Sequence, residues 1–315
     1  MRILMFEKLS KYKTIIKASI SLIFIYILFS KFIQASSFEL IRHMGPGTLL
    51  ICLALSFLSL VFKSMRWKTM IEMVGGKINF LNLVELYLIG FYYGSISPGR
   101  AGEFVKGSRL SNNGLQTKKG LISILYERFY DIATPIAFVS IYYITYAFLH
   151  KEVSSFLLLL GTYLISIVLW IGMIHAFQLF KKRIQFLKNI DDICLTPTWR
   201  YTFMPATASI LNWACIGLSA FVLLESFNVR IDFPHTMFAV CIAMLSLLIP
   251  MTINGWGIRE AAFVWALSPF AEPSQSIVFS ITFSLIGTYS LALLGLLCEM
   301  RGRGDDGALQ GRERN

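Results

Sequence analysis

The chain reads Ser97-Pro98-Gly99-Arg100-Ala101-Gly102-Glu103 where an apolar stretch is broken by helix-breaking residues. About half a chain later, a second break reads Pro250-Met251-Thr252-Ile253-Asn254-Gly255-Trp256-Gly257-Ile258-Arg259-Glu260. Each break carries an Arg and a Glu in surroundings where charges and helix breakers are costly. Interrupted hydrophobic segments at corresponding places in two halves of a chain point to the binding site of a transporter.

The composition around these breaks indicates a membrane protein. The 315 residues are 56% hydrophobic and only 15% charged, whereas soluble domains usually carry about 25% charged residues. Several uncharged runs approach or exceed the roughly 20 residues that cross a bilayer as a helix: residues 132–149, 153–180, 201–224 and 273–298. The sequence therefore predicts an all-α, polytopic membrane protein.

The charge and the motif content exclude several other classes of protein. The net charge of +11 is explained by basic residues beside membrane spans, so we expect no nucleic-acid partner. The five cysteines form no C-x-x-C pair and the four histidines have no ligand spacing, so neither a metal nor a cofactor is expected. The chain contains no G-x-S-x-G, H-E-x-x-H or Walker motif, which favours a transporter over an enzyme with catalytic residues.

The apolar runs predict about six full spans and two shorter helical hairpins. The spans are expected at residues 14–33, 48–62, 120–149, 153–177, 201–224 and 273–298. Two stretches, 86–110 and 236–271, consist of pieces too short to cross a bilayer, separated by the two breaks, and predict re-entrant hairpins. Residue 31 is Lys and residue 33 is Ile, which makes a poor signal-peptide cleavage site and favours an uncleaved first span.

This arrangement predicts one transmembrane domain over residues 1–300, made of two halves at about 8–150 and 151–300. Each half reads span, span, hairpin, span, and the halves are inverted, as in many transporters. Residues 301–315 are polar and rich in glycine, which predicts a disordered tail.

The distribution of Lys and Arg predicts the orientation in the membrane. With the hairpins re-entrant, most basic residues fall in connections on one side, and Lys63, Arg66, Lys68 and Lys106 are counted among them. Basic residues favour the cytoplasmic side. We therefore expect a multi-pass protein of the bacterial inner (cytoplasmic) membrane with both termini in the cytoplasm.

Charged residues at membrane depth are the candidate substrate-binding groups, together with the Asn of the second break. A charge at the centre of a bilayer costs roughly 2.5–3.5 kcal/mol, so these residues must form pairs or face a wet cavity. The candidate binding residues are Arg100, Glu103, Glu127, Arg128, Asp131, Asn254, Arg259 and Glu260, and the hairpin breaks are made by Pro98, Gly99, Gly102, Pro250, Gly255 and Gly257.

The spacing of these charges allows a structural and a functional interpretation. Glu127 and Asp131 lie four residues apart on one helix face, which suits an ion-pair network that only stabilises the fold. Alternatively, a new helix begins after each break, and its N-terminus attracts anions. With Arg100 and Arg259, this gives two facing cationic sites for a phosphate, because Arg binds phosphate bidentately.

The balance of charge complicates the functional interpretation. Three Arg residues face four carboxylates in this set, a formal charge of minus one. Anion binding would then require one carboxylate to be protonated or engaged elsewhere, and coupling to protons becomes an option.

Four motifs, in this order, carry a resemblance to a known family: Arg66-Trp67, residues 97–103, Glu127-Arg128-Phe129-Tyr130-Asp131, and residues 254–260. Together they resemble the lysylphosphatidylglycerol synthase transmembrane region, or flippase-like, family over about residues 8–300. The resemblance implies a membrane domain that moves a lipid between leaflets. The soluble aminoacyl-transferase domain that follows it in some members is not recognised here, so translocation is expected rather than lysyl transfer.

The sequence thus favours a flippase-like transporter of an anionic, phosphate-bearing lipid. The expected partners are a phospholipid or polyprenyl-phosphate-linked substrate, the surrounding membrane lipids and enzymes of envelope biosynthesis. One alternative is a membrane-embedded transferase that acts on a lipid, with Glu127 and Asp131 as catalytic groups. Another is a non-catalytic scaffold of an envelope-synthesis complex.

Overall fold

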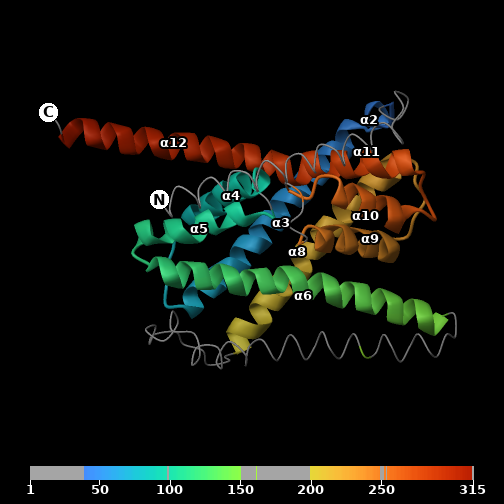
Figure 1. Ribbon diagram of the computed structural model, residues 1–315, viewed down its shortest axis with the longest axis horizontal. Helices are drawn as coiled ribbons and strands as arrows, with labels where there is room; N and C mark the ends of the chain where they lie inside the picture. The colour runs from blue at the N-terminus through green and yellow to red at the C-terminus, as the bar shows by residue number, and fades with distance from the viewer. Residues whose placement is uncertain are drawn as a thin grey trace, which may run out of the picture.

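The computed structural model describes residues 39–97, 99–149, 161, 199–248, 252 and 254–313. This part of the chain is helical, without strands (Figure 1). The span expected at residues 14–33 lies outside the described residues, as do Pro98, Pro250 and, apart from residue 161, the span expected at residues 153–177. By length and composition, three described helical stretches could cross a membrane: Pro46–Met73, Phe203–Ser226 and Pro273–Arg301.

The described part of the first half begins with the short helix α2 (Glu39–His43) and the long helix α3 (Pro46–Met73). A proline in the first turn of α3 suits a helix start, because an N–H group at that position would have no acceptor within the helix. Gly75 ends the helix with φ of 81°, and the N–H of Gly76 donates to the carbonyl of Ile71 at 2.9 Å, the arrangement of a Schellman cap. The helix extends beyond the expected span 48–62, so its last three turns carry basic residues into the interior.

The first break turns the chain back on itself. Helix α4 (Phe80–Ser95) is followed by three short helical segments, η2 (Ala101–Phe104), α5 (Val105–Ser108) and η3 (Arg109–Asn113), and η2 and α5 pack against α4. Gly99 and Arg100 are both left-handed, with φ of 58° and 55°. A Cβ atom on Gly102 would lie 2.1 Å from the carbonyl oxygen of Tyr93, so only glycine permits this close return.

Two long helices, one from each half, pack across the boundary between the halves. Helix α6 (Thr117–Leu149) matches the expected span 120–149, and α8 (Trp199–Ser226) matches the expected span 201–224. Helix α3 packs extensively along α8, and α6 contacts both α3 and α9. Residues of the first half are therefore directly packed on residues of the second.

The second break forms another helix–turn–helix unit. Helices α9 (Phe233–Ser246) and α10 (Ile258–Leu267) pack against each other. Between them Asn254, Gly255 and Gly257 have positive φ values of 48°, 74° and 90°. In Figure 1 the unit α4–α5 lies toward the left-hand end of the molecule and α9–α10 toward the right-hand end. The two units therefore lie toward different ends of the molecule in this view.

The last stretch contains a π-helical turn and a helical tail. Helix α11 (Pro273–Ser284) passes through the π-helical turn η4 (Leu285–Tyr289) into α12 (Ser290–Glu313). The tail predicted to be disordered from residue 301 is instead helical as far as Glu313, and Figure 1 shows it projecting from the body. Extending an existing helix avoids the nucleation step that an isolated segment would need.

The interior contains two apolar clusters, which correspond broadly to the two halves. One is built around α8, α9, α10 and α11, with Phe263 and Phe279 at its centre. The other is built around α3, α4 and α6, with Trp67 and Tyr87 at its centre. The outer surface is also apolar, since Leu50, Phe203 and Leu293 are more than half exposed, which suits contact with lipid.

Candidate functional site

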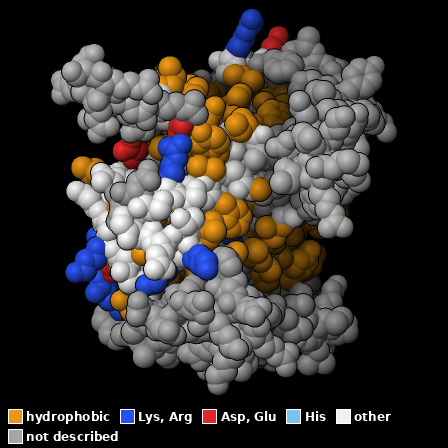
Figure 2. Space-filling model, turned by 60° about the vertical axis from the view of Figure 1, so that its left-hand side comes forward, with side chains coloured by type: hydrophobic (Ala, Val, Ile, Leu, Met, Phe, Trp, Pro, Cys, Tyr) orange, Lys and Arg blue, Asp and Glu red, His pale blue; other side chains and the backbone are white. Residues whose placement is uncertain are grey.

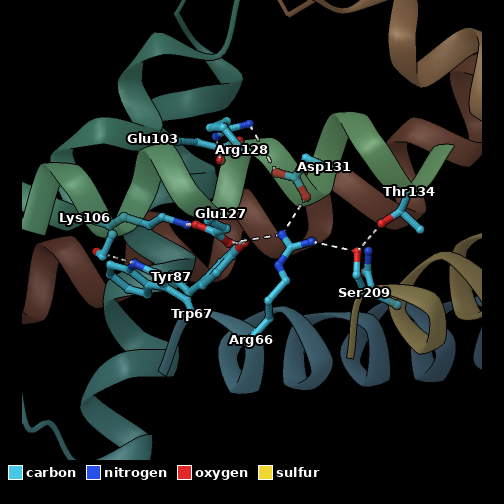
Figure 3. Close-up of polar contacts among 12 residues, drawn as sticks. Arg66, Trp67, Tyr87, Glu103, Lys106, Glu127, Arg128, Asp131, Thr134 and Ser209 are labelled. Atoms are coloured by element: carbon cyan, nitrogen blue, oxygen red, sulfur yellow. Dashed lines mark hydrogen bonds and ion pairs between the residues drawn. The ribbon is translucent and has the colours of Figure 1, made fainter. Parts of the chain in front are cut away.

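Lys106 lies at the inner end of a network of charged side chains (Figure 3). Its Nζ atom is 2.5 Å from Oε2 of Glu127, and the side chain is fully buried. The ammonium also lies 3.5 Å from the ring centroid of Tyr87 and 4.6 Å from that of Trp67. A carboxylate and two aromatic faces compensate this cation for its loss of water.

Arg66 lies between the carboxylates of Glu127 and Asp131 and contacts both. Its Nη2 atom lies 2.5 Å from Oδ1 of Asp131 and 3.4 Å from Oε1 of Glu127. Its Nη1 atom donates to Oγ of Ser209 at 3.1 Å, and that hydroxyl lies 2.8 Å from Oγ1 of Thr134. The Tyr87 hydroxyl donates to Glu127 as well. A single guanidinium on α3 therefore joins α6 and α8.

The outer end of the network reaches the first break. Arg128 forms ion pairs with Glu103 and, at 3.6 Å, with Asp131. Glu103 in turn lies 2.6 Å from Nε of Arg100. The ion-pair network is therefore a continuous alternation of cations and carboxylates, in the order Lys106, Glu127, Arg66, Asp131, Arg128, Glu103 and Arg100.

The exposed fraction of the side chains differs between the two ends of the network. The side chains of Arg66 and Glu127 are 0% and 1% exposed, whereas those of Asp131 and Arg100 are 23% and 16% exposed. Removing one partner of a buried ion pair typically costs 3–5 kcal/mol because the other charge is left uncompensated. The inner end of the network is thus fully buried, whereas Asp131, Arg128 and Arg100 at its outer end are partly exposed.

Arg100 lies on the wall of a cavity between the two halves. The space that protein atoms leave open there, including its mouth, is about 560 Å³. The walls come from α3, α4, the first break, α8, α9, α11, η4 and α12, and this central cavity is lined by polar residues such as Ser56, Lys63, Arg100 and Ser284 and by apolar residues such as Met244 and Phe283. Figure 2 shows apolar side chains through the middle of one face of the molecule, with Lys and Arg side chains mainly to one side.

Two cations border this cavity around one aromatic ring. The Nζ atom of Lys63 lies 5.2 Å from the ring centroid of Phe91, and Cζ of Arg100 lies 5.3 Å from it. Within the described part of the chain, no carboxylate lies within ion-pair distance of Lys63, and none lines the cavity. An anion that enters the cavity would therefore meet two cations.

Including Lys63, Arg66 and Lys106 reverses the charge balance that the sequence suggests. The network and Lys63 together contain five cations against three carboxylates, a formal excess of two positive charges. The sequence-based balance of minus one omits Lys63, Arg66 and Lys106 because they were assigned to cytoplasmic connections. Arg66 and Lys106 do not lie in connecting loops, since they belong to α3 and α5 and are fully buried. Lys63 borders the cavity.

The second break forms a separate, closed cluster. Glu260 accepts from the N–H of Gly257 at 2.6 Å and from Nη2 of Arg259 at 2.7 Å. Ser280 donates to the same carboxylate at 3.0 Å, and the Arg259 side chain is 2% exposed. Arg259, where the sequence predicts an accessible cationic site, is therefore covered in this structure and paired with Glu260.

Asn254 belongs to the closed cluster as well. Its Nδ2 atom donates to the hydroxyl of Tyr289 at 3.1 Å, and Nε1 of Trp256 donates to the same oxygen at 2.5 Å. Tyr289 ends η4, whose residues Gly287 and Thr288 line the central cavity. The second break thus contacts the cavity wall through η4.

The structure brings together five predicted residues and separates three. Arg100, Glu103, Glu127, Arg128 and Asp131 share one network. Between the described residues of that network and Asn254, Arg259 or Glu260, no hydrogen bond or ion pair is formed.

Sequence analysis missed Lys63, Lys106 and Tyr87 as members of the site, and used Arg66 only in a motif and in the count of basic residues. The Arg66-Trp67 pair was a usable signal, because both side chains are fully buried in the network. No comparable signal marks Lys63, whose position beside Phe91 depends on the packing of α3 against α4.

These features define the class of protein. The apolar helices, the exposed apolar surface and the internally paired charges are those of a multi-pass helical membrane protein. The chain belongs to the lysylphosphatidylglycerol synthase TM region family, which it matches over residues 14–295. It is also similar to a UPF0104 membrane protein of Methanocaldococcus jannaschii, at 23% identity over 219 residues, which are 65% of this chain and 92% of that protein.

Proposed function

We propose that this protein is a flippase-like transporter that moves an anionic, phosphate-bearing lipid between membrane leaflets. The observation that carries the proposal is the central cavity between the two halves, where Lys63 and Arg100 flank Phe91. The phosphate would bind to these two cations. The acyl or polyprenyl chains would remain in the bilayer, beside the apolar outer surface.

The opposed helix–turn–helix units support a mechanism of alternating access. In this proposal α4–α5 and α9–α10 are re-entrant hairpins that enter from opposite sides, and both termini are cytoplasmic. Sites formed at discontinuous helices between inverted halves are typical of transporters that alternate between two open states. The π-helical turn η4 borders the cavity, and π-helical turns frequently occur at functional sites.

The left-handed backbone of Arg100 also supports a functional role for this residue. A residue other than glycine in that region costs of order 1–3 kcal/mol and persists where the surroundings impose it. The ion pair between Arg100 and Glu103 orients the guanidinium. The remainder of the network would hold this arginine at the break while the substrate passes.

This proposal differs from the sequence-based one in two respects. Arg259, Glu260 and Glu127 become structural residues, because each is buried and fully engaged. Coupling to protons is no longer required for anion binding, since cations outnumber carboxylates around the cavity. The protein would act in the cytoplasmic membrane, and enzymes that produce or consume the lipid are proposed partners.

A proteoliposome assay tests the proposal. The purified protein is reconstituted with a trace of fluorescent phosphatidylglycerol, and dithionite quenching measures how much of the lipid changes leaflet. We expect translocation by the wild type and a loss of at least tenfold in rate for Arg100→Gln. Arg200→Gln is the matched control, because Arg200 pairs with Glu72 at an exposed position and such pairs contribute little.

Three results would contradict the proposal. The first is no translocation by the wild type of this lipid or of a polyprenyl phosphate. The second is equal rates for Arg100→Gln and the control. The third is chemical conversion of the lipid, detected by mass spectrometry, which would indicate a membrane transferase.

A further inference from the structure

Three of the four serine hydroxyls that line the central cavity already use their hydrogen atoms in bonds within the protein. Oγ of Ser56 donates to the carbonyl of Cys52 at 2.8 Å, and Oγ of Ser284 donates to the carbonyl of Ser280 at 2.7 Å. Oγ of Ser59 donates to Oδ1 of Asn212 at 2.7 Å. A carbonyl can only accept, so Ser56 and Ser284 must be the donors. These three cavity hydroxyls therefore have only acceptor lone pairs left for a ligand.

The cavity thus combines two kinds of recognition group. Lys63 and Arg100 attract an anion, whereas Ser56, Ser59 and Ser284 can accept hydrogen bonds from a ligand. A phosphate alone has strong acceptors and would leave these serine oxygens without a donor. A ligand that satisfies both groups must carry donors in addition to its phosphate.

The charge of the site distinguishes between O–H and ammonium donors. Among the described residues, no Asp or Glu lines the cavity, and the nearby charges have a formal excess of two positive charges. An ammonium group that leaves water needs a negative partner, because buried charges are otherwise strongly disfavoured. Neutral hydroxyl groups carry no such requirement.

We infer that the central cavity selects a lipid whose phosphate is joined to an uncharged polyol, such as inositol or a sugar, and disfavours aminoacyl or ethanolamine head groups. This inference rests on the proposed function for its lipid substrate and adds the chemical class of the head group. The phosphate binds to Lys63 and Arg100, and the hydroxyls of the polyol donate to Ser56 and Ser284.

Lipid binding in detergent tests the inference without any transport. Native mass spectrometry compares three dioleoyl lipids: phosphatidylinositol, phosphatidylethanol and phosphatidylethanolamine. Phosphatidylethanol has the same phosphodiester charge as phosphatidylinositol but no hydroxyl donors, so their ratio isolates the polyol. We expect phosphatidylinositol to bind about tenfold tighter than phosphatidylethanol, as two net hydrogen bonds allow, and phosphatidylethanolamine to bind most weakly.

The double variant Ser56→Ala with Ser284→Ala tests the acceptors directly. Both substitutions retain the helical backbone bonds, so the fold is expected to persist, which a thermal unfolding curve verifies. The preference for phosphatidylinositol should fall to about twofold or less, with the affinity for phosphatidylethanol unchanged. Ser226→Ala is the control, because Ser226 also donates to a carbonyl, that of Leu223, but does not line the cavity.

The outcomes separate this inference from the proposed function. Equal affinity for phosphatidylinositol and phosphatidylethanol, strongest binding of phosphatidylethanolamine, or an unchanged preference in the double variant would each overturn the inference. Selective binding in a protein that fails to translocate lipid would uphold the inference and remove the transporter. Translocation without selectivity between the lipids would uphold the transporter and overturn the inference.

Discussion

Arg66 and Asp131 form the central contact of the site, with Nη2 and Oδ1 only 2.5 Å apart although 65 residues separate them in the sequence. The same nitrogen lies 3.4 Å from Glu127. This contact closes the ion-pair network between α3 and α6, and the other end of the guanidinium contacts α8 through Ser209. One arginine thus couples the fold of the two halves to the position of Arg100 at the cavity.

Replacing Arg66 should destabilise the protein more than any exposed substitution. Arg66→Met leaves two carboxylates without their shared cation, and we expect a loss of about 3–5 kcal/mol in the free energy of unfolding. Thermal unfolding in detergent measures the effect. Arg200→Gln, at an exposed ion pair with Glu72, should change the stability by less than about 1 kcal/mol. Equal unfolding temperatures would refute the structural role of Arg66.

Glu127 and Asp131 should differ in what their removal changes. Glu127→Gln leaves the buried Lys106 without a negative partner, so we expect low expression and a markedly lower unfolding temperature. Asp131 is partly exposed, with a side chain 23% exposed, so Asp131→Asn should be milder. Fluorescence-detected size-exclusion chromatography compares the two. If Asp131→Asn proved the more damaging, our assignment of the structural acid would be wrong.

Arg100→Gly should separate stability from function. Glycine adopts the left-handed conformation of residue 100, with its φ of 55°, at little cost, and Glu103 keeps its ion pair with Arg128. We therefore expect an unfolding temperature at or above that of the wild type, together with loss of lipid translocation. A variant that is both stable and fully active would show that the guanidinium is not needed.

Gly102→Ala should disrupt the first helix–turn–helix unit. The added Cβ atom would lie 2.1 Å from the carbonyl oxygen of Tyr93, and the backbone there has no flexible side chain that could move aside. We expect a loss of several kcal/mol, within the range of severe overpacking. Gly47→Ala is the matched control, because no atom lies within 4 Å of its Cβ position. Limited proteolysis and thermal unfolding measure the effect. A Gly102→Ala variant that is as stable and as protease-resistant as the Gly47→Ala control would contradict the prediction.

The orientation in the membrane can be tested at two exposed loops. In a cysteine-free background, Lys77→Cys should react with an impermeant maleimide only after the membrane is opened, because this loop is expected to be cytoplasmic. Arg230→Cys should react in intact cells. Both positions are exposed. Labelling of both residues from the same side would be incompatible with opposed re-entrant hairpins.

The sequence by itself determined the class of protein, the positions of the breaks and several of the described helices. Apolar runs, helix breakers and motif order are local properties, so α6, α8 and the two breaks lie where they were predicted. The membrane gives these signals their strength, because a chain in lipid must satisfy its backbone polar groups within each helix.

Only the tertiary structure decided which charges act together. Arg66 and Lys106 resemble loop charges in the sequence, yet packing of α3, α5 and α6 places both in the interior. Packing likewise buries Arg259 against Glu260 and leaves Lys63 beside the cavity. The reason is physical: the effect of a charge depends on its distance from other charges and on its exposure to water, and both are set by contacts between residues far apart in the sequence.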